Sequence, residues 1–281
     1  MADVLTCLSS NSKKDQPCLI EATQEALQFV VMGKAKSTQS IVNLRADLFD
    51  EYVIKDPVED QVAADLSIKL SLNLTTLLDC FQIFGSSSDS TIASITYSCE
   101  DAIFQLSLEE MGVLTTCELT TLYNDETLEI EYGLFTSFRN SAEQCQIVMK
   151  SDLLREAMQE LNDVHGATSV CVEVKSSSGV TLSSEGSLGA CEVSFPKNSD
   201  AFVSFRCEGT GARWMYPLTS LLLGMKALSV ASETYIRINE SGMMCIQHQV
   251  ENNRGFETYV DFLMVAEETF ASYEEDDDLP R

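Results

Sequence analysis

Two segments that lie half a chain apart carry the same pattern of apolar positions. Residues 73–84 read NLTTLLDCFQIF, and residues 217–228 read PLTSLLLGMKAL. In both segments the apolar side chains recur at the i, i+3, i+4, i+7 spacing of a helix with one buried face. Asn73 and Pro217 begin the two segments, and both residue types are favoured where helices start. Leucine at this spacing is common to many helices, so the surrounding sequence must show whether the similarity reflects a repeat.

A second pair of helices is predicted at a similar separation. Residues 151–162 read SDLLREAMQELN, in which the apolar positions follow the helical spacing. Residues 2–11 follow the same rule at first, but Asn11 stands where the last apolar residue would be. The N-terminal copy is therefore predicted to be the weaker helix.

Between and after these helices, apolar and polar residues alternate, as they do in a strand with one buried face. The alternating runs span 27–31, 42–48, 66–72, 104–108, 113–119, 170–174, 191–195, 202–205, 236–238, 244–250 and 259–265. Glycine-containing turns at 110–112 and 240–242 predict hairpins. Each half therefore reads helix, strands, helix, strands. This order predicts an α+β fold of two similar domains, each with antiparallel sheets backed by two helices.

The chain divides into four parts on this pattern. The first domain is predicted over 1–122 and the second over 145–268. Residues 123–144 interrupt the alternation with several acidic residues and are predicted to connect the domains. The acidic segment 269–281 contains the run EEDDD, which cannot bury itself and is predicted to be disordered.

Composition narrows the class of protein. A chain of 281 residues with 44% apolar residues can bury a large core. It has no apolar run of about 18 residues and no apolar signal segment at its start, so we expect a soluble intracellular protein. The net charge of −26 argues against a protein that coats DNA by charge alone, because phosphate binding depends on lysine and arginine.

Cysteine and histidine give no sign of a metal or a cofactor. The ten cysteines contain no CxxC pair, and most stand in apolar strand-like runs, where a reduced thiol behaves as a small apolar side chain. The two histidines, His165 and His248, are too few and too far from any cysteine pair to predict a zinc site.

Three motifs carry a resemblance to a known family. The sequence LLDCFQIFGSS within 73–87, SDLLREAMQEL at 151–161 and EGSLGACEVSFPK at 185–197 resemble the Rad-one subunits of nine-one-one DNA-damage checkpoint clamps, a branch of the PCNA-like sliding clamps. The resemblance extends over nearly the whole chain. It implies the PCNA-like DNA clamp fold and a non-catalytic subunit that needs no cofactor.

The resemblance also implies partners. Rad-nine-like and Hus-one-like subunits would complete a heterotrimeric ring around double-stranded DNA in the nucleus. A checkpoint clamp loader and repair and signalling proteins would act on that ring. One departure concerns the start of the chain: members of the family begin with a strand and a full first helix, whereas only about ten residues precede Asn11. Either the product is shortened or the first domain closes without its first strand.

Site residues follow from the same resemblance. The helices would line the hole, and the expected DNA-facing cations are Lys13, Lys14, Arg155 and Lys226. This lining is only weakly basic, so companion subunits would supply much of the positive charge, and a solvated helix face is the alternative for Arg155 and Lys226. Two strand edges would pair with neighbouring subunits through Val113, Thr115, Cys117, Leu119, Cys191, Val193 and Phe195. A partner groove would be walled by Leu128, Ile130 and Tyr132.

Two other functions share parts of this pattern. A metal-dependent exonuclease needs several converging carboxylates, and the adjacent acids at 100–101 and 109–110 are the candidates, although both pairs fall at predicted turns. A homotrimeric replication clamp would have the same fold. It requires the two edges of one sequence to complement each other.

Overall fold

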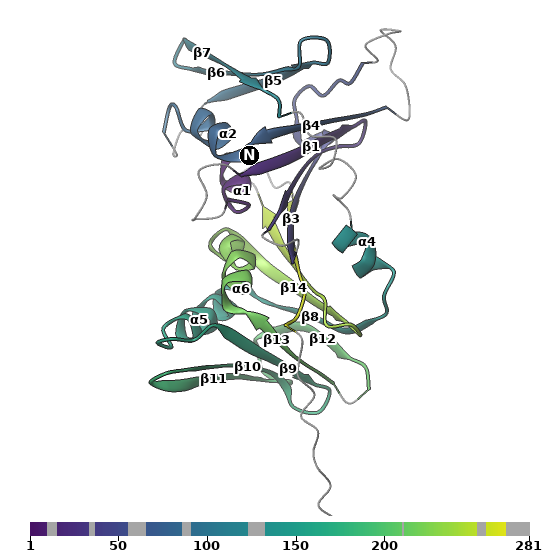
Figure 1. The fold of residues 1–281 in the computed structure, drawn as a ribbon, viewed down its shortest axis with the longest axis vertical. Helices are drawn as coiled ribbons and strands as arrows, with labels where there is room; N and C mark the ends of the chain where they lie inside the picture. The colour runs from purple at the N-terminus through teal and green to yellow at the C-terminus, as the bar shows by residue number, and fades with distance from the viewer. Residues whose placement is uncertain are drawn as a thin grey trace, which may run out of the picture.

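The computed structural model describes most of the chain as two similar halves joined side by side (Figure 1). The described residues are 1–9, 16–33, 37–55, 66–85, 91–122, 133–209, 211–251 and 257–267. The predicted acidic segment 269–281 and residues 123–132 of the predicted connector lie outside these ranges. No helix within them is long and apolar enough to span a membrane.

The first half follows the predicted order. Its elements are α1 (Ala2–Thr6), β1 (Pro17–Thr23), β2 (Ala26–Met32), β3 (Thr38–Arg45), η2 (Ala46–Leu48), β4 (Ser67–Asn73), α2 (Leu74–Phe81), β5 (Ile92–Ser98), β6 (Ile103–Glu110) and β7 (Val113–Thr120). Asn73 caps α2 as its residue type predicts, because its side-chain oxygen accepts the N–H of Thr76 at 3.1 Å. As expected, α1 is the shorter member of its pair.

The second half repeats the order after a short helix. Its elements are α4 (Gly133–Arg139), β8 (Glu143–Lys150), α5 (Ser151–Asn162), β9 (Ser169–Lys175), β10 (Gly179–Gly186), β11 (Gly189–Pro196), β12 (Phe202–Cys207), β13 (Ala212–Pro217), α6 (Leu218–Gly224), η3 (Lys226–Ser229), β14 (Ala231–Asn239), β15 (Met244–Glu251) and β16 (Glu257–Met264). Strand β8 thus begins inside the segment predicted to be connector. Helix α4 was not predicted, because its apolar residues are too few to show a period.

Every strand pairing in the described residues is antiparallel, as predicted, but the sheets do not respect the boundary between the halves. A nine-stranded sheet runs β12-β8-β14-β15-β16-β3-β2-β1-β4, and the ladder between β16 and β3 joins the two halves. Two smaller sheets flank it, β5-β6-β7 and β11-β10-β9-β13. In the second half β14 pairs with β8, whereas its counterpart β5 has β6 as its one partner among the described strands.

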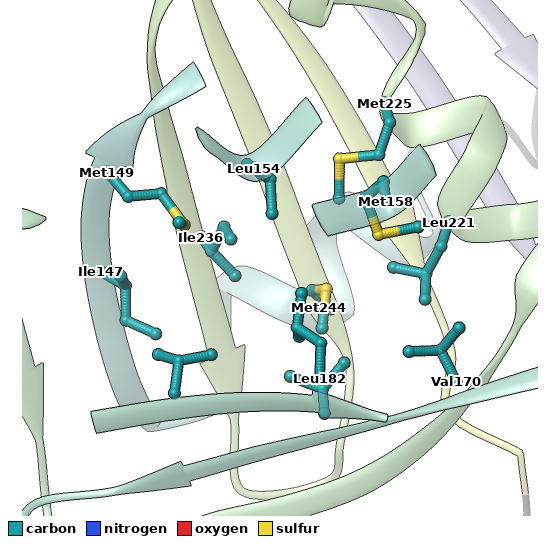
Figure 2. A pocket seen from close by; sticks show the side chains of 12 residues that line it. Ile147, Met149, Leu154, Met158, Val170, Leu182, Leu221, Met225, Ile236 and Met244 are labelled. Atoms are coloured by element: carbon teal, nitrogen blue, oxygen red, sulfur yellow. The ribbon is translucent and has the colours of Figure 1, made fainter. Parts of the chain in front are cut away.

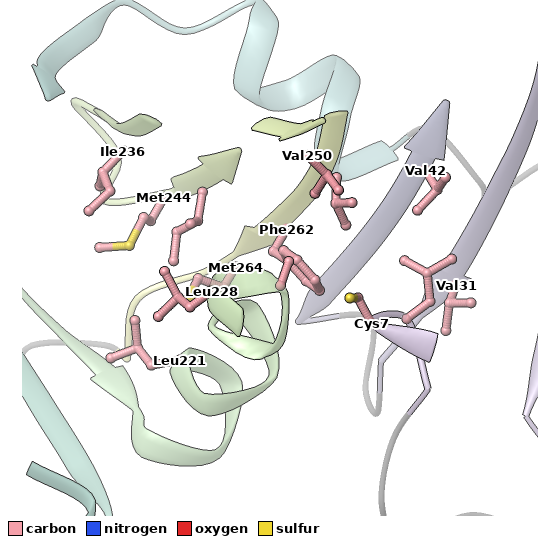
Figure 3. Close-up of a cluster of buried hydrophobic side chains, with 14 of the residues drawn as sticks. Cys7, Val31, Val42, Leu221, Leu228, Ile236, Met244, Val250, Phe262 and Met264 are labelled. Atoms are coloured by element: carbon pink, nitrogen blue, oxygen red, sulfur yellow. The ribbon is translucent and has the colours of Figure 1, made fainter. Parts of the chain in front are cut away.

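One apolar core continues from one half into the other. Val42 of β3 and Phe262 of β16 belong to the same buried cluster as Cys7, which follows α1, and Leu221 of α6 (Figure 3). The four helices α1, α2, α5 and α6 cover one side of the molecule, and α4 lies on the opposite side (Figure 1). Strand β3 is therefore buried on both faces along most of its length.

A buried polar chain fixes helix ends to this core. His248 on β15 is fully buried, with Nε2 2.6 Å from the carbonyl oxygen of Gly224 and Nδ1 2.9 Å from the hydroxyl of Thr234. The hydroxyl of Thr234 also lies 2.8 Å from that of Ser151 at the start of α5. Because a carbonyl only accepts, Nε2 carries a hydrogen. Burial lowers the pKa of His248 to about 4.

This histidine makes the fold sensitive to acid. The unfolded chain binds a proton on His248 near pH 6.5, whereas the folded chain binds it only near pH 4, so the stabilisation is complete above pH 6.5 and is lost as the pH falls toward 4. We expect the free energy of unfolding to drop by about 2 kcal/mol between pH 8 and pH 5 through this group. Urea titrations should show a smaller drop for His248→Gln. His165 is exposed, so His165→Gln is the control. The prediction would be contradicted if the free energy of unfolding changed equally with pH in the wild type and in both variants.

The turn between β14 and β15 depends on a glycine. Gly242 has a φ of +77°, and a Cβ built there would lie 2.6 Å from the ring of Trp214. The side-chain oxygen of Asn239 holds the same turn by accepting the N–H groups of Ser241 and Met243.

Gly242→Ala should therefore lower the free energy of unfolding by roughly 1–3 kcal/mol, because it adds both backbone strain and a clash. Gly189→Ala is the matched control, since nothing lies within 4 Å of a Cβ at that position. Chemical denaturation measures both variants. Equal losses of unfolding free energy for Gly242→Ala and Gly189→Ala would contradict the predicted strain at Gly242.

Candidate functional site

The two strands predicted to pair with neighbouring subunits, β7 and β11, are edge strands of their sheets. Strand β7 is the last strand of β5-β6-β7, and β11 is the last strand of β11-β10-β9-β13. No described strand pairs with the outer edge of either one. Figure 1 places them at opposite ends of the long axis of the molecule. The chain therefore presents two separate rows of backbone groups that can accept another strand.

The direction of the backbone groups on β7 follows from its turn. Met111 and Gly112 both have positive φ, 49° and 79°, and Glu110 pairs with Val113 across this two-residue turn. At the far end the N–H of Thr121 donates to the carbonyl of Ala102 at 3.3 Å. Because the direction alternates along an antiparallel strand, the odd-numbered residues of β7 bond within the sheet. The even-numbered ones turn their backbone groups outward.

Strand β11 has the same phase. The N–H of Lys197 donates to the carbonyl of Ser178 at 3.0 Å, and Gly186 pairs with Gly189 across another two-residue turn. The odd-numbered residues of β11 therefore bond to β10, and Glu192 and Ser194 direct their N–H groups to the open edge.

The predicted interface residues are thus the inward-bonded half of each strand. The structure adds the outward-bonded half, which sequence periodicity did not reveal: Leu114, Thr116, Glu118, Ala190, Glu192 and Ser194. A hairpin register counted from the glycine turns would have found them.

The side chains of the predicted residues pack on the core without being fully covered. Cys117 and Leu119 on β7, and Val193 and Phe195 on β11, are half-buried against the main apolar cluster. Thr115 and Cys191 are also half-buried, whereas Val113 is exposed. A strand added to either edge would cover the remaining apolar surface of these rows.

Two of the four cations expected to face DNA donate hydrogen bonds within the protein. The Nζ of Lys226 on η3 donates to the carbonyl oxygen of Ser9, which follows α1, and so links the second half to the first. Burial lowers the pKa of Lys226. The Nη1 of Arg155 on α5 donates to the carbonyl oxygen of Leu228 at 3.4 Å. Lys13 and Lys14, the other two candidates, lie outside the described residues.

Within the described residues, exposed carboxylates outnumber the cations on the four helices. Exposed carboxylates lie on α1 and α2 and along the outer turns of α5: Asp3, Asp79, Asp152, Glu156 and Glu160. Arg155 and Lys226, which are only half-exposed, are the cations on these helices and η3 within the described residues. This face alone repels phosphate.

The opposite side of the large sheet carries a second apolar cluster. Helix α4 covers it with Phe138, which is 2% exposed and packs with residues of β1, β2, β3, β15 and β16. The N–H of Phe135 donates to the side-chain oxygen of Gln39 at 3.3 Å, and the guanidinium of Arg237 lies 5.4 Å from the Phe138 ring. The predicted groove residues Leu128, Ile130 and Tyr132 lie outside the described residues.

The acids considered for metal-dependent hydrolysis do not converge. Glu100 and Asp101 stand at one end of β6, and Glu109 and Glu110 stand at the other. The hydroxyl of Ser98 donates to the carboxylate of Asp101 at 3.1 Å. Within the described residues no group of three histidine, cysteine or acidic side chains could hold a metal ion.

A small cavity in the interior of the second half is apolar. The cavity between α5 and the sheets measures about 20 Å³ (Figure 2). Its lining is entirely apolar and includes Leu154, Met158, Leu182 and Met244. A ligand there would find no hydrogen-bond partner among these side chains.

Comparison with known proteins places the chain among DNA-damage checkpoint proteins. Residues 1–250 match the family described as Repair protein Rad1/Rec1/Rad17. The cell cycle checkpoint protein RAD1 of Mus musculus is 30% identical over 250 residues, which cover 88% of this chain and 83% of the mouse protein. The DNA damage checkpoint control protein rad1 of Schizosaccharomyces pombe is 25% identical over 268 residues, covering 88% and 79%.

A solved structure gives the fold independently. A chain of the PCNA2-PCNA3 complex from Sulfolobus tokodaii superposes with a TM-score of 0.71 over 94% of both chains, at 14% sequence identity. The predicted PCNA-like clamp fold is therefore confirmed. At this identity the match concerns the fold alone.

The alternating direction of the backbone groups on β11 predicts that two neighbouring prolines destabilise the fold by different amounts. Val193→Pro removes an N–H that bonds within the sheet and should lower the free energy of unfolding by roughly 2–4 kcal/mol. Ser194→Pro removes an N–H that points to the open edge and should cost less than about 1 kcal/mol. Ser194→Ala controls for the lost hydroxyl contact with Thr181. If urea unfolding showed Ser194→Pro to be less stable than Val193→Pro, the assignment of inward and outward backbone groups on β11 would be wrong.

Proposed function

The chain belongs to the Rad1/Rec1/Rad17 family of repair proteins and has the fold of a PCNA-type sliding clamp, and from this premise we propose that it is the non-catalytic subunit of a heterotrimeric ring that encircles duplex DNA. The family and the fold support a subunit of a checkpoint clamp. The ring, its DNA and its further partners are the proposed part.

The observation that carries the proposal is the pair of open edges on β7 and β11. They lie at opposite ends of the molecule, and on both strands the even-numbered residues direct their backbone groups outward. Four helices cover one side of the molecule. Edge-to-edge pairing would extend both small sheets into neighbouring subunits and satisfy the outward backbone groups. Burying half-exposed side chains such as Val193 and Phe195 would add roughly 1.5–3 kcal/mol each if they were fully desolvated.

Charge favours two different neighbours over two copies of this chain. Glu118 on β7 and Glu192 on β11 are both exposed on the edge strands. A ring of identical copies would bring these acids to every junction and line the hole with carboxylates, which DNA repels. Rad-nine-like and Hus-one-like subunits with more basic helices would supply the positive charge.

Encirclement reconciles the acidic surface with a role on DNA. A closed ring is held by topology, so it needs no strong phosphate contacts, and weak contacts allow it to slide. A clamp loader would open and close such a ring in the nucleus. Repair and signalling proteins would dock on its outer side, where α4 lies, and Leu128, Ile130 and Tyr132, which precede α4 in the sequence, are the proposed groove residues.

The test is retention on circular and linear DNA. The chain is co-expressed with the other clamp subunits of its own organism and loaded on a nicked circular duplex with the matching loader. We expect the ring to remain on the circle in high salt and to leave once a restriction enzyme linearises it. Equal retention on linear and circular DNA would contradict encirclement.

Two variants separate ring closure from folding. Ser194→Pro should prevent assembly, whereas Ser194→Ala should assemble and load like the wild type. The molar mass of the purified chain alone completes the experiment. A monomer is expected, and a stable trimer of this chain would instead support the homotrimeric clamp.

A further inference from the structure

Two cysteines face each other across the edge of the large sheet. Cys145 on β8 and Cys207 on β12 are direct partners in the antiparallel register, and their sulfur atoms lie 3.1 Å apart. Both thiols are free. This is closer than two unbonded sulfurs need to be for packing alone, and the clamp function makes no use of it.

The backbone already has the separation that a disulfide requires. Directly paired residues of an antiparallel ladder have Cα atoms about 4.5–5.5 Å apart, and disulfides span about 4.4–6.8 Å. Closing the sulfur separation to the bonded value of about 2.05 Å therefore needs side-chain rotation and no movement of the strands.

The two thiols differ in access. Cys207 is the last residue of β12, the strand that ends the nine-stranded sheet, and it is partly exposed. Cys145 is 1% exposed, and burial raises its pKa. Of these two thiols, a small oxidant in solution therefore reaches Cys207 first, and the buried Cys145 is the thiol that reacts with it afterwards.

We propose that Cys145 and Cys207 form an oxidation-sensitive dithiol site, which a peroxide converts into an intrachain disulfide. The peroxide transfers one oxygen atom to the sulfur of Cys207, giving a sulfenic acid and one molecule of water. The sulfur of Cys145 then attacks that of Cys207, the S–O bond breaks, and the hydroxyl leaves as water with the proton of Cys145. Two electrons pass from the two sulfurs to the peroxide, and a thiol reductant restores the dithiol.

The disulfide would change the behaviour of β12. Among the described residues β8 is the one strand that pairs with β12, so ladder hydrogen bonds hold β12 on one side. The disulfide would add a covalent link between this edge strand and β8. Phe202 and Phe205 of β12 stack with each other at 5.2 Å, and Phe202 packs on Phe195 of β11 at 6.4 Å. Oxidation would thus stiffen the side of the second half that supports β11.

A second thiol pair provides an internal comparison. Cys80 on α2 and Cys117 on β7 also share a hydrogen bond, but they lie on a helix and a strand rather than opposite each other in a ladder. Cys99 is exposed at a turn and is the thiol that oxidant meets most directly. Site-resolved mapping is therefore needed to assign any oxidation.

The experiment uses the whole reduced chain and hydrogen peroxide. After a graded exposure, remaining thiols are alkylated under denaturing conditions, and the protein is digested without reduction for mass spectrometry. We expect the peptides of Cys145 and Cys207 to be linked at the lowest peroxide dose that gives any intrachain disulfide. We also expect dithiothreitol to separate them. The bond closes a loop of 62 residues, so the oxidised chain should melt roughly 5–10 °C higher.

Variants make the assignment specific. Cys207→Ser should abolish both the linked peptides and the melting shift, whereas Cys191→Ser should retain them, because Cys191 on β11 makes no hydrogen bond to another thiol within the described part of the chain. If Cys207→Ser does not fold, the peptide map of the unaltered chain decides the question alone. Full alkylation of Cys145 and Cys207 after peroxide treatment, or a disulfide that joins a different pair first, would overturn the proposal.

Discussion

The ladder between β16 and β3 is the interaction on which the rest of the structure depends. It pairs Val260 with Val42 and Phe262 with Ser40, and so converts two similar halves into one nine-stranded sheet with one continuous core. Because the sheet is continuous, the helices of both halves cover the same side, and the two small sheets point away from each other. The placement of both open edges follows from this single junction.

Open edges are costly for a soluble protein, since unpaired N–H and C=O groups invite adventitious strands. Here each edge combines an outward row of backbone groups with half-buried apolar side chains on the inner face. Exposed acids such as Glu118 and Glu192 stand on the same strands. In the proposed ring, these carboxylates would disfavour pairing between identical copies and favour a partner of complementary charge.

Two of the cations predicted to face DNA also make contacts within the protein. Lys226 and Arg155 stand on the predicted helix face, yet each donates to a carbonyl group near a helix end. In the case of Lys226 the acceptor belongs to the other half of the chain, so the contact holds the two halves together. The acidic face that remains suits a subunit whose neighbours carry the positive charge, and a ring held by topology rather than by affinity.

The sequence alone determined the fold class and many, though not all, of the helices and strands. Helical and alternating periods are local properties, so the leucine spacing of 73–84 and 217–228 and the glycine turns at 110–112 and 240–242 predicted α2, α6 and two hairpins correctly. The motif resemblance supplied the clamp fold. Tertiary structure decided what depends on residues far apart in the chain. Each of four features brings together groups whose contact no local period encodes: the β16–β3 junction, the burial of His248, the contact of Cys145 with Cys207 and that of Lys226 with Ser9. Helix α4 belongs to the same class, because only the apolar cluster beneath Phe138 gives that short segment a reason to be helical.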